Sequence, residues 1–421
     1  MNAAQSMAGR RRLSQAELDM ILTAHEKFVT GKQGGRRASL KFVNLSGLDL
    51  SFRNLVDADF TGSALEGCRM VRTKLDRASL FGCDLRKADL RQSVMVRADL
   101  RGACLRGANL AQADLTQADF REGQIAIPHP SKGLDTLRHE TRQGEVDEVN
   151  FSGATLDGSQ FEGVSAFKAD FSDCSLRGAK LSGANLKEAN LSGAILDGAD
   201  VKGANLEGAN LQGSVMAGVD TSTARTTGSN MSGALIAVTP QALARVKELY
   251  QRALDNQLWC QSGGQEGQCA RLDGEDLRPL ADRLKGLRLT AMSAKGACMV
   301  GMDLSGAQLQ GANLQNADLR AANLRGADLR GAKLTGANLT KADLRQAFLT
   351  ALPLGPDRRT VTHLGSARLR YVMAQTANLS EAVLDGADLR GADFTGARVL
   401  KTSFRDCDLS QVQGLDLSGP S

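Results

Sequence analysis

The chain has 421 residues, with 52 basic and 47 acidic side chains and a formal net charge of +5. So small an excess of positive charge argues against a strong nucleic-acid binder and against a strongly acidic mimic of nucleic acid. Aromatic residues make up only 4% of the chain, and no apolar run approaches the length of a membrane span, so we expect neither a ring-filled core nor a transmembrane helix.

The eight cysteines are scattered singly along the chain, and its first residues lack the apolar stretch of a secretory signal. Disulfide-stabilised secreted proteins show the opposite of both features. We therefore expect a cytoplasmic protein with reduced thiols.

The first predicted element is an amphipathic helix over residues 13–32, which follows a basic tail of residues 1–12 that is predicted to be disordered. Ser14 and Glu17 have the spacing of a capping box, in which each side chain bonds the backbone N–H of the other residue at the start of a helix. Leucines and His25 then recur on one face. We expect His25 to be packed against the protein rather than catalytic.

From residue 38 onward the dominant pattern is an apolar residue at every fifth position. These positions run without a slip over Leu40–Phe120, and the period returns over Phe151–Ile236, Leu289–Leu349 and Leu369–Leu409. The residue two before each of them is usually Ala, so in an extended backbone both side chains face inward and the polar residue between them faces water. The next two residues, the second often Gly, must turn the chain. Four such turns would close a square coil of about 20 residues, and successive coils would stack about 4.8 Å apart.

The repeated pattern A-[DN]-L-x-G, as in ANLRGADLRGAKLTGANL at 322–339, resembles that of the pentapeptide-repeat family. The resemblance implies an all-β solenoid, a right-handed quadrilateral β-helix, over residues 38–236 and 270–411. Inserts are expected at 121–148 and 350–366, where the period stops. An amphipathic α-helix is excluded for these runs, because an apolar stripe with a period of five would rotate around the helix.

A second amphipathic helix is predicted at 239–262, with Thr239 as N-cap and Pro240 in its first turn. The loops that follow the two predicted helices align with one inserted residue, FVTGKQGGRRASL at 28–40 against WCQSGGQEGQCARL at 259–272. The matched pairs are Gln33 and Gln265, Gly35 and Gly267, Ala38 and Ala270, and Leu40 and Leu272. The sequence therefore predicts two tandem halves, each with a helix, a solenoid and an insert.

The ends of the two solenoids are expected to differ in how they are covered. An open first coil exposes apolar core and unpaired strand edges, so we expect each amphipathic helix to cap one. The tail at 412–421 offers no such helix. That end is expected to be exposed, covered by the tail or paired with a second copy in a homodimer.

No grouping of residues predicts catalysis, a metal site or a cofactor. His129 and His139 lie in the first insert, but the HxxxH or CxxC spacing of a metal site is absent. Of the cysteines, Cys83 and others in the inward position are expected to be buried and inert, whereas Cys104 and Cys298 are expected to face outward.

The outer faces are therefore the candidate functional surface. Residues one coil apart should stack, which would place Arg86 over Arg106 and Arg101 over Arg121. The predicted interaction surface consists of Arg86, Lys87, Arg91, Arg97, Arg101, Arg106, Arg121, Arg325 and Arg345. Carboxylates such as Asp84 interleave with these residues, so a solvated face of mixed charge is expected and a basic binding stripe is the alternative. Because no aromatic residues accompany the stripe for base stacking, nucleic acid is not the expected partner.

The leading interpretation is a non-enzymatic binding scaffold, a rigid rod that presents flat charged faces to a protein partner. The family resemblance also implies an alternative, a DNA mimic that engages a topoisomerase such as gyrase, which the net charge of +5 disfavours. The further alternatives are an enzyme or metal site built on the inserts, especially residues 124–148, and a secreted effector.

Overall fold

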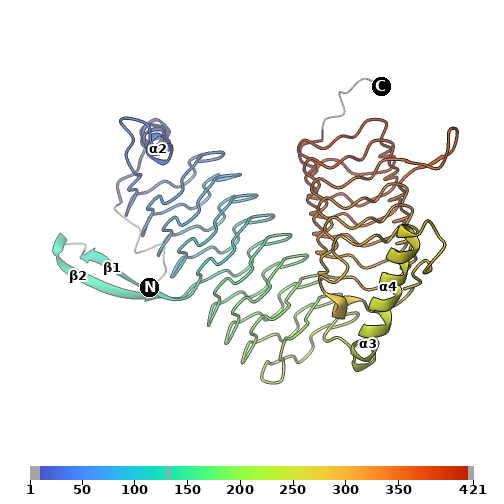
Figure 1. The fold of residues 1–421 in the computed structure, drawn as a ribbon. Coiled ribbons are helices and arrows are strands. Elements are labelled where there is room, and N and C mark those ends of the chain that lie inside the picture. Colours follow the sequence, from blue (N-terminus) through green and yellow to red (C-terminus); the bar gives the residue numbers. More distant parts are fainter. Residues whose placement is uncertain (1–9, 130–132, 416–421) are drawn as a thin grey trace. The chain divides into compact units, whose positions relative to one another are not determined.

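Figure 1 shows the computed structural model, which describes residues 10–129 and 133–415. The chain divides into two compact units, Met1–Ala237 and Val238–Ser421. In the described residues, no helix combines the length and the apolar character needed to cross a bilayer.

In its described residues, 10–129 and 133–237, the first unit contains one helix and one hairpin besides its coils. Helix α2 (Gln15–Val29) precedes the coils, and strands β1 (Gly123–His129) and β2 (Gly133–Arg142) form an antiparallel hairpin that leaves them at the first insert.

The second unit starts with a broken helix. Helices α3 (Pro240–Ala244) and α4 (Val246–Gln261) meet at Arg245, so the single helix predicted at 239–262 is two. Thr239 is the N-cap as predicted, and its Oγ1 accepts the N–H of Ala242 at 3.1 Å. The coils that follow are interrupted by the 3₁₀ helix η1 (Arg278–Leu280) and by a short hairpin of strands β3 (Leu352–Pro353) and β4 (Arg359–Thr360).

Both units are solenoids in which each side of a coil contributes a single bridge position. Asp49 pairs in parallel with Arg69, and Arg69 with Asp89, and this step recurs along both units. Backbone hydrogen bonds join the coils at each step, as between the N–H of Leu50 and the oxygen of Arg69 at 2.7 Å. The leucines at every fifth position and the alanines two before them are buried along both units, except near their C-terminal ends, where Ala234 and Leu409 are partly exposed. The inward assignment that the five-residue period predicts is confirmed.

The polar residue in the middle of each triplet has a role in the turn that the period alone did not predict. Its side chain reaches the backbone N–H two residues on, at 3.0 Å from Asn44 Oδ1 to Ser46 and at 2.9 Å from Asp49 Oδ1 to Ser51. A side chain that bonds its own backbone in this way stabilises a turn. This bond accounts for the preference for Asp and Asn at the middle position.

Helix α2 packs on the first coil of its unit. It begins with the predicted capping box, because the N–H of Ser14 donates to Glu17 Oε2 at 2.8 Å and the N–H of Glu17 to Ser14 Oγ at 3.3 Å. Leu18, Leu22 and His25 on its inner face are completely buried. Both predictions for this helix, the capping box and the apolar face with His25, are confirmed.

Side chains of α2 also bond the open backbone edge of the first coil. Gln15 Oε1 accepts the N–H of Asp49 at 3.0 Å while its Nε2 donates to the oxygen of Asp49 at 2.8 Å. Glu26 Oε1 accepts the N–H of Asn54 at 3.4 Å. The N–H groups of Asp49 and Asn54 lie on two sides of the first coil, where no preceding coil supplies a backbone acceptor.

A third side of the first coil is bonded by the chain that leads into α2. Arg12 forms a parallel bridge with Asn44, and the oxygen of Arg11 accepts the N–H of Asn44 at 2.8 Å. Residues 1–9 of the tail predicted at 1–12 lie outside the described residues, whereas residues 11 and 12 are paired with the coil rather than disordered.

In each unit one buried side chain joins the helix to the coils at two points. His25 Nδ1 accepts the N–H of Ala38 at 3.0 Å, and its Nε2 bonds the oxygen of Val56 at 3.0 Å. Asn256 Oδ1 accepts the N–H of Ala270 at 2.7 Å, and its Nδ2 donates to a second backbone oxygen at 3.1 Å. Because Ala38 and Ala270 are matched in the sequence alignment of the two halves, the same joint is made by an imidazole in one unit and by an amide in the other.

A matched glycine follows each helix. A Cβ on Gly35 would lie 2.4 Å from the nitrogen of Phe28, and a Cβ on Gly267 would lie 2.2 Å from the oxygen of Asp255. The returning chain therefore touches the helix backbone in both units, and no side chain fits at either position.

The parallel pairing between successive coils continues across the first insert at the same positions of the repeat. Cys104 pairs with Glu145, so the coil resumes there and the insert is shorter than the predicted 121–148. Gly144 takes the inward position of the returning repeat, where a Cβ would lie 1.7 Å from the oxygen of Phe120. Phenylalanines fill the core at this point, with the rings of Phe120 and Phe161 stacked 4.3 Å apart.

The second insert is also shorter than predicted. His363 pairs with Lys333, so the coil resumes before residue 366, the predicted end of the insert at 350–366. Thr362 takes the inward position of the returning repeat. At the C-terminus, Gln413 still pairs with Asp393, so the coils extend into the predicted tail at 412–421, of which residues 416–421 lie outside the described residues.

Candidate functional site

Most arginines of the predicted interaction surface are held by an aspartate of their own repeat. In the triplet Asp-Leu-Arg, or Asp-Phe-Arg at 119–121, the middle residue points inward, so the two charged side chains lie together on the outside. Arg91 donates from Nε and Nη2 to the two carboxylate oxygens of Asp89, at 2.8 and 2.7 Å. The same bidentate pairs join Arg86 to Asp84, Arg101 to Asp99, Arg121 to Asp119 and Arg345 to Asp343.

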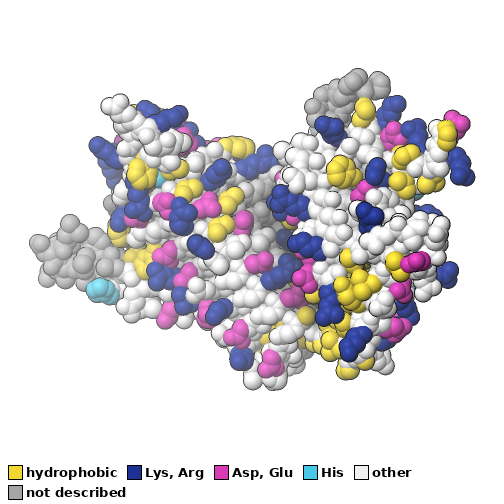
Figure 2. Space-filling model, in the orientation of Figure 1, with side chains coloured by type: hydrophobic (Ala, Val, Ile, Leu, Met, Phe, Trp, Pro, Cys, Tyr) yellow, Lys and Arg dark blue, Asp and Glu magenta, His cyan; other side chains and the backbone are white. Residues whose placement is uncertain are grey.

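These pairs change the electrostatics that the stacking of arginines suggested. The hydrogen bonds from Arg91 hold the pKa of Asp89 below its ordinary value, so Asp89 stays charged at neutral pH. Arg86 also approaches Glu66 at 3.4 Å, and Arg106 pairs with Glu145. A carboxylate therefore stands beside each stacked arginine, and Figure 2 shows acidic and basic side chains intermixed on the face in view. The structure favours the mixed face over a basic stripe.

Three residues of the predicted surface differ from the rest. Lys87, Arg97 and Arg325 make no ion pair with any described carboxylate. Arg97 Nε donates to Gln117 Oε1 at 2.8 Å, and Arg325 Nε to Gln346 Oε1 at 3.3 Å. The nine predicted residues thus lie outside the core but do not form one uniform patch.

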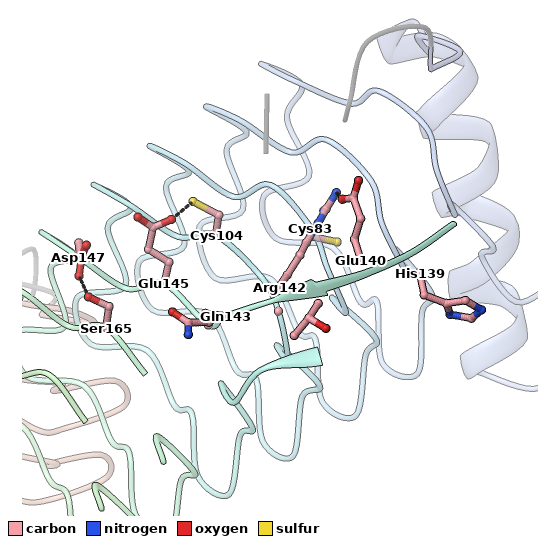
Figure 3. Close-up of a pocket in the computed structure, with 12 residues that line it drawn as sticks. Cys83, Cys104, His139, Glu140, Arg142, Gln143, Glu145, Asp147 and Ser165 are labelled. Carbon is pink, nitrogen blue, oxygen red and sulfur yellow. Dashed lines mark hydrogen bonds and ion pairs between the residues drawn. The ribbon is translucent and has the colours of Figure 1, made fainter. Parts of the chain in front are cut away.

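A hollow of about 700 Å³ opens where the β1–β2 hairpin lies beside the coils. Figure 3 shows β2 running past the coils, with Cys104 and Glu145 pointing toward one another and His139 pointing away from them. Cys104 Sγ donates to Glu145 Oε2 at 3.2 Å, and Ser165 Oγ donates to Asp147 Oδ1 at 2.6 Å. Two carboxylates of this hollow, Glu145 and Asp147, are thus hydrogen-bonded by neighbouring side chains.

Cys104 corrects one prediction. It lies at an outward position of its repeat, as expected, but its neighbours at the insert cover it and leave it 9% exposed. Burial, with the hydrogen bond to Glu145 in support, raises the pKa of its thiol to about 12. Burial likewise raises the pKa of Cys83, an inward cysteine, to about 12. Both thiols are protonated at neutral pH and are poor nucleophiles.

The histidines are not brought together. His139 is exposed on β2, His363 lies in the second unit, and the side chain of His129 lies outside the described residues. In the part of the chain that the structure describes, no three His, Cys, Asp or Glu side chains form a group that could hold a metal ion.

The hairpin packs on a column of glycines, which is a feature that the sequence analysis missed. A Cβ on Gly82 would lie 2.7 Å from the side chain of Ile125, and one on Gly102 would lie 3.2 Å from Arg142. Arg142 Nη1 donates to the oxygen of Gly82 at 2.9 Å. Glycines recur one coil apart at uncovered corners too, as at Gly47 and Gly67, so their spacing alone does not indicate where the hairpin packs.

Comparison with known proteins agrees with the coils. A family model described as Pentapeptide repeats, with 8 copies, matches residues 54–92, 93–125, 147–183, 174–213, 288–326, 312–350 and 376–411. No curated protein matches the sequence.

Several solved structures are similar in part. QnrB1, described as a plasmid-mediated fluoroquinolone resistance protein, is 19% identical over 50% of this chain and 88% of its own, with a TM-score of 0.18. HetL, a pentapeptide repeat protein involved in heterocyst differentiation regulation from the cyanobacterium Nostoc sp. strain PCC 7120, is 18% identical over 92% of this chain and 94% of its own, with a TM-score of 0.15. A pentapeptide repeat protein from the thylakoid lumen of Arabidopsis thaliana is 26% identical over 27% and 69%, with a TM-score of 0.18.

The repeats themselves assign the chain to a family. The matched repeats cover more than half of the chain, and the coils show the ladder that a five-residue repeat builds. The chain belongs to the pentapeptide-repeat family, whose fold is the right-handed β-helix.

Proposed function

We propose that this protein is a non-enzymatic binding scaffold, whose solenoid faces present charged side chains to a protein partner. The observation that carries the proposal is the bidentate pair within each Asp-Leu-Arg triplet, as between Arg91 and Asp89. Each pair fixes the direction of a long side chain before any partner arrives. Side chains that are already ordered lose less conformational entropy on binding, so such rows favour association.

The hollow beside the β1–β2 hairpin supports binding rather than catalysis. Its thiol at Cys104 is protonated at neutral pH, and its carboxylates are engaged by neighbouring side chains. A nucleophile or general base needs a group with a pKa near the working pH and free geometry toward a substrate.

The pairs also argue against the alternative that the protein mimics DNA and engages a topoisomerase in that way. A mimic of duplex DNA needs faces dominated by carboxylates, because DNA carries one phosphate charge about every 1.7 Å along its axis. Here an arginine stands beside each carboxylate of an Asp-Leu-Arg triplet. A supercoiling assay with gyrase at micromolar protein tests this alternative, and inhibition would restore it.

The proposal extends to the ends of the solenoids. Helices α2 and α4 act as caps, because each bonds the first coil through a buried side chain, His25 or Asn256. At the other end, Phe404 and Leu409 of the last coil are only half-buried and Leu400 is 53% exposed. A second copy of the chain that docks there would bury these residues. Mass measurement in solution at several concentrations tests this homodimer, and a strict monomer would exclude it.

The binding function is tested with the full chain immobilised in an extract of the organism that encodes it. Proteins retained by the parent are compared with those retained by Arg91→Gln/Arg101→Gln and by Lys180→Gln/Lys187→Gln, which removes the same charge elsewhere in the unit. We expect a protein that the parent and the lysine variant retain and the arginine variant loses. If the parent retains no protein in preference to an unrelated solenoid, the scaffold proposal is wrong.

A further inference from the structure

The second residue of each turn, two positions after the inward leucine, has a left-handed backbone, with φ of +78° at Gly47 and +67° at Gly62. Glycine adopts this conformation without strain. In the coils before the first insert, this residue is mostly glycine at two of the four corners: Gly47, Gly62, Gly67, Gly82, Gly102 and Gly107.

The other two corners contain no glycine in any of these coils. One corner has Phe52, Arg72, Gln92 and Gln112, one above the other, which we name the first column. The next corner has Asp57, Arg77, Arg97 and Gln117, the second column. Their φ values range from +54° at Arg77 to +63° at Phe52. In both columns, the residue in every coil therefore has a left-handed backbone although it carries a side chain.

Contacts within the columns do not explain this choice. Arg72 Nε donates to Gln92 Oε1 at 2.6 Å, Gln92 Nε2 to Gln112 Oε1 at 3.0 Å and Arg97 Nε to Gln117 Oε1 at 2.8 Å. Exposed side-chain contacts of this kind contribute little, whereas a left-handed backbone at a residue with a Cβ is costly. We therefore expect glycines at these positions to be at least as stable as the side chains.

Open space does not explain the columns either. At the glycine corner next to the first column, a Cβ on Gly47 or Gly67 would meet no atom within 4 Å, yet glycine is used at both levels. Where the hairpin covers a corner, at Gly82 and Gly102, glycine is required by contact. Side chains thus replace glycine at every level of two adjacent corners, whereas at the other two corners they do so only at Phe42 and Lys87. Strain that the fold does not need is a feature of functional surfaces.

We propose that the two columns and the coil face between them form the docking surface for a protein partner with an acidic surface. This inference rests on the proposed scaffold function and adds a second contact face beside the Asp-Leu-Arg rows. Phe52 is 69% exposed and can anchor the contact, as buried aromatic residues do at interface centres.

The charge of this face indicates the chemistry of the partner. Lys74, between the columns, is exposed and makes no ion pair with a described carboxylate, and Arg97 is bonded to an amide rather than to a carboxylate. The acidic groups of the face are already engaged or partly buried: Asp57 is bonded by Arg77 and Asp114 by Thr116, and Asp76 is half-buried. The groups left to a partner are mainly N–H donors, which a carboxylate-bearing surface complements.

The half-buried valines between the columns add an apolar strip to the face. Val94 and Val96 flank the buried Met95 and are both partly exposed. An apolar strip with donors along both edges fits a folded protein better than a nucleic acid, which would need stacking rings or a dominant positive charge.

A stability measurement tests whether the columns are kept for a reason other than folding. The variant Gln92→Gly/Arg97→Gly/Gln112→Gly/Gln117→Gly is compared with the parent by urea unfolding, followed by hydrogen exchange of residues 38–122. We expect it to be at least as stable as the parent, and Gly67→Gln, which adds strain at an open glycine corner, to be less stable. A variant less stable than the parent would mean that the columns serve the fold, and would overturn the proposal.

Site-specific photo-cross-linking tests the surface itself. A photoreactive phenylalanine analogue replaces Phe52, Gln92 or, as the control at a glycine corner, Gly67, and the full chain is irradiated in the organism that encodes it. We expect a protein adduct from positions 52 and 92, absent from 67, that maps to an acidic segment of the partner. The adduct should fall about tenfold in Lys74→Glu/Arg97→Glu, since one lost hot-spot contact is worth that much.

The outcomes separate the two proposals. Adducts that arise from the Asp-Leu-Arg rows but not from positions 52 and 92 would overturn this surface and leave the scaffold function intact. Adducts from no face of the protein would count against both. An adduct to RNA or DNA at positions 52 and 92 would overturn the choice of a protein partner.

Discussion

The joint between α2 and the first coil should respond to acid, whereas the equivalent joint in the second unit should not. His25 is completely buried, and its Nδ1 accepts the N–H of Ala38 at 3.0 Å. Burial is the main cause that lowers the pKa of His25 below its ordinary value. Asn256, which makes the same bond to Ala270, does not titrate.

The sign of the effect follows from the direction of the pKa shift. The unfolded chain binds a proton on His25 more readily than the folded chain, so the free energy of unfolding rises with pH in this range. The contribution is fully present above the ordinary pKa of about 6.5 and is lost as the pH falls through the lower pKa of the folded state.

The magnitude follows from the bond that protonation breaks. A protonated Nδ1 can no longer accept the Ala38 N–H, and a buried donor without an acceptor costs about 1–3 kcal/mol. Opening of the α2 joint should then become about tenfold more frequent for each 1.4 kcal/mol lost. Asp57, Glu26 and Arg37 also lie near His25, so a control must leave these charges in place.

The assay is amide hydrogen exchange of α2 and of α4 in the full chain, measured at pH 7.5 and pH 5 and corrected for the intrinsic rate. We expect protection to fall in α2 alone. His25→Asn keeps an acceptor and a donor, as Asn256 shows, and should abolish the pH dependence. Asn256→His should transfer it to α4. If His25→Asn leaves the pH dependence of α2 unchanged, the reasoning about this joint is refuted.

Three further predictions concern the repeats. Leu324→Lys places an ammonium group in the buried column and should unfold the second unit at much lower urea, whereas Arg325→Lys should cost less than about 0.5 kcal/mol; fluorescence of Trp259, the single tryptophan, follows that unit. Gly326→Ala should cost about 1 kcal/mol through its left-handed φ of +65°, and Gly331→Ala more, because its Cβ would lie 2.6 Å from Thr360 and 2.8 Å from Leu352; equal urea midpoints would contradict this. Asp89→Ala should destabilise the turn by about 1 kcal/mol more than Asp89→Asn, which keeps an acceptor for the Arg91 N–H. The hydrogen-exchange rate of the Arg91 amide measures the difference.

The sequence predicts the repeating parts of this fold because each repeat carries its own signal. The five-residue period identifies Leu324 as inward and Arg325 as outward without knowledge of any other coil. The capping box of Ser14 and Glu17 is equally local. The bond from Asn44 to the turn was missed although the preference for Asp and Asn at the middle position was visible. That pattern is itself the signal of a side chain that bonds its own backbone.

The parts that were not predicted depend on contacts between distant segments. The returns at Gly144 and Thr362 replace the usual Ala with Gly or Thr, so the first repeat after each insert keeps only half of its signal, an apolar Val146 or Leu364 in phase with the repeats that follow. The burial of Cys104 depends on the path of the insert, which no local pattern specifies. Likewise, the pairing of each arginine with its own aspartate is a question of side-chain geometry, since the sequence places other carboxylates one coil away.

The length of the first insert leads to a final prediction, that the β1–β2 hairpin can be removed without breaking the ladder. Cys104 pairs with Glu145 across the insert, 41 positions on, whereas Asp84 pairs with Cys104 only 20 positions on. The insert therefore adds 21 residues to one coil, which is not a multiple of five. Deletion of residues 122–142 would join Arg121 to Gln143 and place Val146 five positions after Phe120, in the inward position that it already occupies.

The matched control is deletion of residues 122–141, which removes one residue fewer and leaves an extra residue in the turn. We expect the first deletion to keep the far-ultraviolet circular dichroism of the parent and to lose only the contacts of the hairpin, chiefly those of the buried Ile125. The second deletion should unfold at lower urea, because the extra residue has no position in the ladder. If the shorter deletion is the more stable of the two, the coil does not need the exact residue number that the pairing of Cys104 with Glu145 implies.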